Sequence, residues 1–275
     1  MLKINKYSLI KNAAVLGVAS LSLSLIATSS SFSDGHIYGE NNPVTVKGYK
    51  GSKTDSTAYT GQMARQLQHN SLKKIVSKGN PSDPTSNTLN KMLNYFENKD
   101  KTKSMAILDP KSSSKFPVKQ KIVGEISTGS NLAGKADGRV QLSWPNNMTG
   151  ADVIRFMIKK ASKISGGVDM RNGMNYPQLI SKYTMGAVLY HQACDNYLDE
   201  KMTASNKPND KPYKKGAYYT GKEHSWDEAF GYWGAAAHTM TLSAQQSYDV
   251  AKKKDLKAAD FNKDGVVDLY KEMTY

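Results

Sequence analysis

The sequence predicts an all-α fold, an antiparallel bundle of helices joined by long loops. Apolar residues recur at the three- and four-residue spacing of a helix through most of the chain. Two segments, 149–152 and 220–223, have the form of a capping box, which marks the start of a helix. Residue patterns typical of a strand are confined to two short segments, 118–123 and 139–144.

The predicted helices each have their apolar residues on one side. They are expected over residues 60–78, 84–98, 149–166, 177–202 and 224–254, with long loops at 109–147 and 205–219. The buried side of the longest clear helix is expected to be Leu179, Ile180, Tyr183, Gly186, Ala187, Tyr190 and Cys194. Small residues such as Gly186 and Gly231 are expected to let two helices approach closely.

Residues 223–234 are the most informative stretch, because they combine three carboxylates, a histidine, four aromatic rings and two glycines. In a helix, His224 and Glu228 lie one turn apart on the same face. Trp226, Phe230 and Trp233 have the spacing of a buried apolar stripe. We therefore expect a helix that places polar ligands beside a large aromatic anchor.

His224 and Glu228 could begin a divalent metal site, since imidazole nitrogen and carboxylate oxygen suit iron or zinc. Asp227 is the other candidate ligand on this helix. Two ligands do not close a site, so further ligands must come from elsewhere, and His191 and Asp195 are the candidates. This set predicts a transition-metal or polar site on the helix.

Helix capping and packing explain the same residues without a metal. Glu223 would reach back to the amide of Thr220, and acidic residues near a helix N-terminus are favoured by the helix dipole. A packed histidine bonded to its neighbouring carboxylate is the matching alternative for His191. Both interpretations stay open from the sequence.

Residues 260–268 match the calcium-loop pattern D-x-[DN]-x-[DN]-G. The ligands would be the side chains of Asp260, Asn262, Asp264 and Asp268 and the backbone carbonyl of Val266. Gly265 permits the sharp turn that this loop requires. Position twelve is Lys271 instead of the usual glutamate, and Glu272 follows one place later. The sequence predicts an EF-hand-like calcium loop, with an ordinary polar turn as the alternative.

The N-terminal segment has the features of a cleavable signal peptide. Lysines precede an apolar run, and small residues follow it near position 29. We therefore expect a signal peptide over 1–29, a flexible segment over 30–58 and a helical domain over 59–275. The mature protein is expected in the periplasm or at the cell surface, without an integral membrane segment.

The chain is strongly basic, with a formal net charge of +14. Only four of its 38 basic residues are arginines, and these are not clustered, which argues against nucleic-acid binding. Charge alone could attract an anionic cell-surface polymer, and a solvated lysine-rich surface is the simpler interpretation. Cys194 is the only cysteine, so no intramolecular disulfide can form.

The run at 223–232 resembles the signature of the bacterial imelysin-like family catalogued as domain of unknown function 4856. Segments 59–65 and 185–187 and the C-terminal loop fit the same pattern. The resemblance implies an exported helical bundle related to imelysins, which are associated with iron uptake and were once assigned as metallopeptidases. It also implies further helices, so the chain is expected to be short or truncated.

The chain departs from the imelysin metal motif, Gly-x-His-x-x-Glu. Lys222 stands in the place of the glycine, and Asp227 in the place of the glutamate unless Glu228 substitutes for it. This departure weakens both the peptidase role and the iron role that the resemblance implies. Membership of the family is therefore better supported than either of these roles.

These observations predict an exported, non-enzymatic protein that binds a metal ion or small ligand at the cell envelope and calcium in its C-terminal loop. The sequence has no HExxH and no Gly-x-Ser-x-Gly motif, so it offers few recognisable catalytic residues. Two alternatives stay open. One is a metal-dependent hydrolase that uses His224 and Glu228, and the other is a structural or adhesive surface protein.

Overall fold

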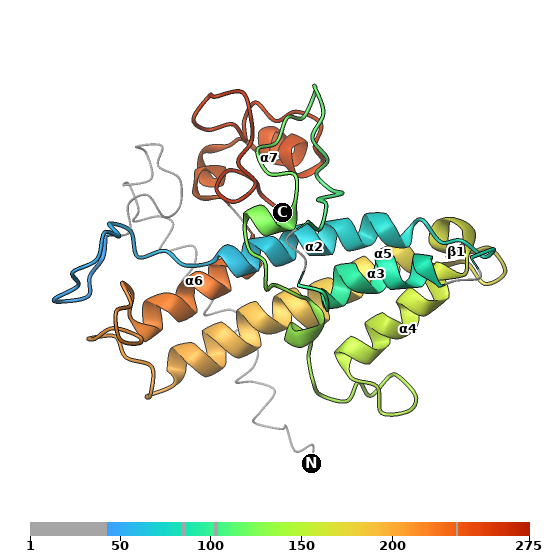
Figure 1. The fold of residues 1–275 in the computed structure, drawn as a ribbon, viewed down its shortest axis with the longest axis horizontal. Coiled ribbons are helices and arrows are strands. Elements are labelled where there is room, and N and C mark those ends of the chain that lie inside the picture. Colours follow the sequence, from blue (N-terminus) through green and yellow to red (C-terminus); the bar gives the residue numbers. More distant parts are fainter. Residues whose placement is uncertain (1–42, 84–85, 102–103, 235) are drawn as a thin grey trace, which may run out of the picture. The chain divides into compact units, whose positions relative to one another are not determined.

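Helices supply nearly all of the regular structure (Figure 1). The computed structural model describes residues 43–83, 86–101, 104–234 and 236–275, so the predicted signal peptide lies outside the described residues. The main helices are α2 (Thr60–Val76), α3 (Asn87–Glu97), α4 (Gly150–Ser162), α5 (Tyr176–Thr184), η5 (Met185–Lys201), α6 (Gly221–Trp233) and α7 (Ala244–Ala251). The described part contains one sheet, the antiparallel pair β1 (Val168–Asp169) and β2 (Met174–Asn175). The prediction of a mainly helical fold is confirmed.

Helix α2 is the centre of the packing and contacts α3, α5 and α6 along its length (Figure 1). Its apolar residues Leu67, Leu72 and Val76 are completely buried, as their spacing predicts. Burial of each such side chain contributes about 1.5–3 kcal/mol. Helix α4 packs on α3 and α5, and α6 runs along η5.

The buried apolar residues form two clusters. The larger one contains residues of the helices α2, α3, α4, α5, η5 and α6, such as Leu72, Ile158 and Tyr197. The smaller one joins the start of α2 to residues 105–126 and to the C-terminal segment, through residues such as Leu67 and Leu269. In Figure 1 these two segments lie on the same side of α2. The C-terminal loop is therefore anchored on a core of its own.

Helix η5 continues α5 with backbone bonds of π type, which run from residue i+5 to residue i. The N–H of Met202, for example, donates to the carbonyl of Tyr197. Such a turn holds more than the 3.6 residues of an α-helix. The buried positions accordingly recur every four to five residues, at Thr184, Val188 with Leu189, Gln192 with Ala193, and Tyr197.

The expected buried side of this helix is wrong at several positions. Tyr190 is 64% exposed, Leu179 is 40% exposed, and Gly186 has no atom within 4 Å of the position of an added Cβ. Gly186 therefore does not bring two helices together. The prediction assumed α-helical spacing throughout, and each π-type turn rotates the side chains that follow it, such as Tyr190, away from that phase. Leu179 lies before these turns, in α5, where Ile180 faces the core as expected and Leu179 does not.

The helix expected over 224–254 is interrupted, which corrects the prediction. Helix α6 ends at Trp233, and its C-cap residue Gly234 has a φ of 73°, the left-handed conformation that stops a helix. A short turn, η6 (Ala237–Thr241), follows, and Ser243 then caps α7 together with Gln246. The strand-like segments 118–123 and 139–144 form no strand in the described structure and make only isolated single-residue bridges.

Candidate functional site

Helix α6 begins with the capping box that the sequence predicts. The N–H of Glu223 donates to the hydroxyl of Thr220, and the N–H of Thr220 donates to Oε2 of Glu223 at 2.6 Å. Lys222 turns to η5, where its ammonium group donates to the carbonyls of Met202 and Ala204. Both charged side chains are thus used to end one helix and begin the next.

Two of the three aromatic residues expected in the buried stripe of α6 face water, which corrects that prediction. Trp226 is 50% exposed and Trp233 is 72% exposed. The buried face contains several small residues as well as Asp227 and Tyr232. A Cβ added at Gly231 would lie 2.6 Å from Cβ of Gln62 and 2.9 Å from Cβ of Tyr59. Helix α6 therefore packs too closely on α2 for tryptophans to fit between them.

We expect Gly231→Ala to destabilise the protein by about 1–3 kcal/mol, because the atoms in the way are attached directly to the backbone of α2. The gain in helix propensity, about 1 kcal/mol, opposes this loss and is smaller. Urea unfolding measures the difference. Gly186→Ala is the matched control and is expected to be neutral or stabilising, since open space surrounds that position. An unchanged stability in Gly231→Ala would show that the helices are not held this closely.

The three ligands expected on α6 do not converge. His224 Nε2 lies 3.5 Å from Oε2 of Glu228, so this pair forms as predicted. Asp227 instead accepts the N–H of Ala58 at 2.9 Å and is 5% exposed. Within the described ranges, no group of three His, Cys, Asp or Glu side chains is placed to hold a metal ion.

His191 and Asp195 belong to a different network. His191 Nδ1 lies 3.1 Å from Asp195 Oδ2, which also accepts a hydrogen bond from Arg139. The same guanidinium binds Asp137, and its hydrogen bonds lower the pKa of that carboxyl to about 2. The packed His–Asp pair is thus the interpretation that the structure supports for these two residues.

Glu228 is the centre of the polar side of α6. Its Oε1 accepts a hydrogen bond from Nε2 of Gln62 on α2 at 2.9 Å, and its side chain is 19% exposed. Burial and the charge of Glu228 raise the pKa of Tyr197 on η5. Arg65, Lys135 and Lys201 complete the surroundings of this carboxylate. We refer to these residues as the Glu228 cluster: Gln62, Arg65, Lys135, Tyr197, Lys201, His224 and Glu228.

His224 is held between aromatic rings. The ring of Tyr219 stacks on it with a centroid distance of 4.6 Å, and Tyr213 lies at 5.1 Å. Burial lowers the pKa of His224, the charge of Glu228 opposes this, and Lys207 with other lysines adds to it. The imidazole is therefore neutral at pH 7, and its Nδ1 has no hydrogen-bond partner within the described residues.

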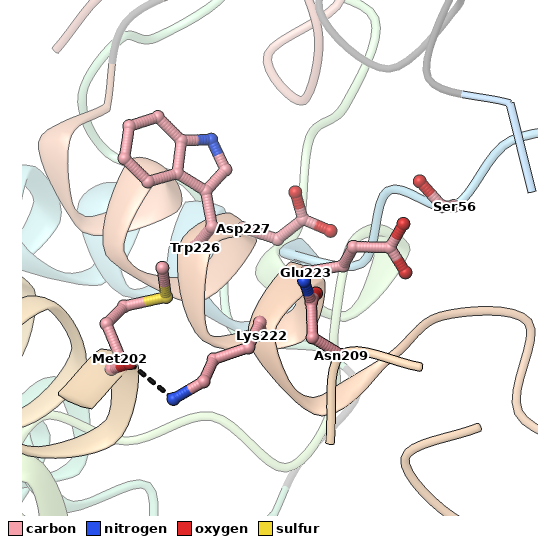
Figure 2. A pocket seen from close by; sticks show the side chains of 7 residues that line it. All are labelled: Ser56, Met202, Asn209, Lys222, Glu223, Trp226 and Asp227. Atoms are coloured by element: carbon pink, nitrogen blue, oxygen red, sulfur yellow. Dashed lines mark hydrogen bonds between the residues drawn. The ribbon is translucent and has the colours of Figure 1, made fainter. Parts of the chain in front are cut away.

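A hollow of about 520 Å³ lies on another side of α6 (Figure 2). Its lining is Ser56, Met202, Asn209, Lys222, Glu223, Trp226 and Asp227. In Figure 2 the indole of Trp226 stands apart from the carboxylates of Glu223 and Asp227, which point toward Ser56. Since Lys222, Glu223 and Asp227 already bond to the backbone, the polar groups of this hollow maintain the fold.

The C-terminal loop has the turn that the calcium pattern predicts. Gly265 has a φ of 88°, and the carboxylate of Asp260 accepts the N–H groups of Asp264 at 3.1 Å and Gly265 at 2.9 Å. Asn262 Oδ1 accepts the N–H of Asp264 as well. The start of the loop thus folds around its own side-chain oxygens, the type of ligand that calcium prefers.

Glu272, one place after position twelve, bonds back to the backbone of the loop. Its Oε1 accepts the N–H of Asn262 at 3.2 Å, and its Oε2 accepts the N–H of Asp268 at 2.8 Å. The residue is 1% exposed. Burial raises the pKa of Glu272, the two N–H groups oppose this rise, and Asp260 and Asp268 add to it. A cation in the loop would offset this crowding of negative charge.

Asp268 is the loop residue that departs from the expected arrangement. Its carboxylate accepts hydrogen bonds from Lys119 at 3.2 Å and from Gln120 at 2.9 Å. A parallel bridge between Val118 and Val267 holds the two segments together. The residue types and the turn fit calcium, while Asp268 bonds to a neighbouring segment.

The fold and the two sites define a mainly helical protein with a charged centre on α6 and an oxygen-rich C-terminal loop. The chain belongs to the family described as Domain of unknown function (DUF4856), whose model matches residues 40–267. The family predicted from residues 223–232 is thereby confirmed, and the relation to imelysins stays a prediction. Neither the curated proteins nor the solved structures gave a match. Within the described residues, no helix is both long and apolar enough to cross a membrane.

Sequence reasoning did not identify the cations of the Glu228 cluster. Arg65 lies in the segment 59–65 that carried part of the resemblance, and Lys201 ends the predicted helix 177–202. Lys135 comes from the turn η3 (Ala133–Lys135), inside a loop that has no periodic pattern. Only the packing of distant segments brings these three residues to Glu228.

Proposed function

We propose that the chain is an exported, non-enzymatic binding protein of the periplasm or cell surface. The observation that carries this proposal is the Glu228 cluster, in which α2, η5 and α6 gather half-buried charged and polar side chains. Ionised side chains are rarely withdrawn from water unless a partner offsets the cost. A small ligand bound beside α6 would be such a partner.

The proposal includes a calcium ion in the C-terminal loop. Asp260, Asn262, Asp264 and Glu272 would hold it, with the carbonyl of Val266. Their carboxylates are not gathered around one point in the described part of the chain, so the loop would close on the ion. Asp268 would join them by exchanging Lys119 for the ion. Calcium outside the cytoplasm is abundant enough to fill even a weak site. Its role would be to stabilise the segment that packs against the start of α2.

The hydrolase alternative receives less support. A catalytic zinc site needs three protein ligands and an open position. Asp227 is turned to the backbone of Ala58, and His191 with Asp195 is bound to Arg139. His224 and Glu228 are therefore left as a pair, which suits binding better than metal-assisted hydrolysis.

Metal content and peptidase activity of the mature protein test the binding role against the hydrolase role. We expect no hydrolysis of casein by the wild type, and iron and zinc contents that are the same in wild type and in His224→Ala. Circular dichroism checks that the variant folds. Casein hydrolysis that is lost in His224→Ala, together with lost iron or zinc, would contradict the proposal and favour the hydrolase.

Export has its own test. The intact mass of the chain recovered from the cell envelope is expected to lack about the first 29 residues, because the segment has signal-peptide features. A full-length chain in the cytoplasm would contradict this part of the proposal.

A further inference from the structure

Two positively charged side chains in the Glu228 cluster rest on a pair of tyrosine rings. Tyr197 of η5 and Tyr232 of α6 are stacked, with centroids 5.9 Å apart. The ammonium group of Lys201 lies 3.9 Å from the centroid of Tyr197, and the guanidinium carbon of Arg65 lies 5.8 Å from that of Tyr232. Cation–π contacts of this kind hold each charge in place without neutralising it.

Lys135 brings a third positive charge to the same place. It is half-buried, and burial lowers its pKa; the charge of Arg65 lowers it further, and Glu228 opposes both. Burial also lowers the pKa of Lys201. The charge of Glu228 raises this pKa, and the charge of Lys135 lowers it further. The lysines therefore lie close enough to repel each other.

The positive charges of the cluster are not balanced by ion pairs. Among the described residues, no carboxylate oxygen lies within 4 Å of Arg65, Lys135 or Lys201, and neither lysine ammonium donates a hydrogen bond to a protein oxygen. Glu228 is bonded to Gln62 and paired with His224 instead. Three cations thus face one carboxylate. The Nε of Arg65 donates to the carbonyl of Asn131 at 2.9 Å, while the two ammonium groups keep their donor capacity.

We propose that Arg65, Lys135 and Lys201 form a binding site for a small oxyanion with two or more negative charges, carried by carboxylate or phosphate groups. A guanidinium beside ammonium groups is suited to such oxygens, since it donates two parallel hydrogen bonds while the ammonium groups add point charges. Gln62 and His224 hold Glu228, whose carboxylate makes no ion pair with these cations.

The half-buried position of these cations favours a small ligand over a polymer. Attraction to an anionic surface would need only exposed lysines, which the chain has in abundance. Here the charges are instead drawn in between helices and against aromatic rings. This inference rests on the proposed binding function and names the ligand class for it.

Isothermal titration calorimetry with the mature chain tests the proposal, at fixed ionic strength, with citrate and pyrophosphate as the multivalent probes and acetate as the monovalent one. We expect citrate, pyrophosphate or both to bind, and acetate to bind at least about tenfold more weakly. Lys135→Gln and Lys201→Gln are each expected to weaken binding about tenfold or more, because each removes one charge-assisted contact. Binding of only one probe would identify carboxylate or phosphate as the group recognised.

Two further variants keep the test specific. Lys163→Gln removes the same charge from an exposed position and is expected to bind within about twofold of the wild type. Lys201→Arg retains the charge and is expected to retain most of the affinity. The absence of any heat with both multivalent probes would overturn the proposal, as would equal weakening in Lys163→Gln or unchanged binding in both glutamine variants.

The outcome is separable from that of the proposed function. A failure to bind citrate and pyrophosphate would leave export and the lack of peptidase activity unaffected. Peptidase activity that depends on His224 would instead contradict the proposed function while leaving the anion titration to be judged on its own variants.

Discussion

Acidification from pH 7 to pH 4 is expected to lower the free energy of unfolding by about 3 kcal/mol through His69 alone. His69 is 6% exposed, and its Nε2 lies 3.0 Å from the carbonyl oxygen of Ser181. Burial lowers the pKa of this imidazole from 6.5 to about 4; the bond to Ser181 opposes this, and Lys73 and other lysines add to it. The effect is large because the shift spans more than two pH units.

The sign follows from which state binds the proton first. Below pH 6.5 the unfolded chain protonates His69, while the folded chain keeps it neutral until about pH 4. The unfolded state is therefore favoured as the pH falls through this window, and the loss is complete below it. Burial also lowers the pKa values of His224 and His238, which adds to the loss in the same direction.

Urea unfolding at pH 7, 5.5 and 4 measures this effect, and His69→Gln removes it while keeping a side-chain donor near Ser181. The variant is expected to lose clearly less stability on acidification than the wild type. Ser181→Ala, which removes a neighbouring hydroxyl but leaves the imidazole buried, is expected to keep the wild-type pH dependence. An identical acid dependence in wild type and His69→Gln would contradict the assignment.

Calcium is expected to stabilise the protein by about 3 kcal/mol at one hundred times its dissociation constant, because the ion binds the folded loop and not the unfolded chain. For a domain of this size the melting temperature should rise by about 5–10 °C. The physical reason is Glu272, which lies buried beside the charges of Asp260 and Asp268. A cation would offset that repulsion and tie the end of the chain to the core on α2.

Thermal melting with and without calcium measures this effect, with magnesium at the same ionic strength as a control. Asp260→Asn and Glu272→Gln are expected to lose the calcium-dependent rise. Asp210→Asn, at an exposed position in the loop before α6, is expected to retain it. If both loop variants respond to calcium as the wild type does, the ion does not bind at residues 260–272.

Local sequence signals predicted the parts of the fold that depend on local structure. The spacing of Leu67 and Leu72 placed α2 correctly, and the capping boxes at Thr149 and Thr220 placed the starts of α4 and α6. Such signals depend on neighbours within one or two helical turns. They do not reveal which face of a helix meets which partner.

The errors arise where a distant segment decides the outcome. Trp226 and Trp233 have the spacing of a core stripe, but the close approach of Gly231 to α2 leaves no room for an indole at that contact. Glu272 bonds back to the N–H groups of Asn262 and Asp268, and the loop packs against residues 118–120. The spacing within the loop encodes neither contact. The cations around Glu228 come from three separate segments, and no local pattern joins them.

The metal content of mature protein purified from the periplasm without chelators is the most direct test of the proposed calcium-holding binding protein. Elemental mass spectrometry is expected to find calcium near one per chain, lost in Asp260→Asn, and no iron or zinc that depends on His224. A chain without calcium, or one that carries iron or zinc which His224→Ala removes, would contradict it.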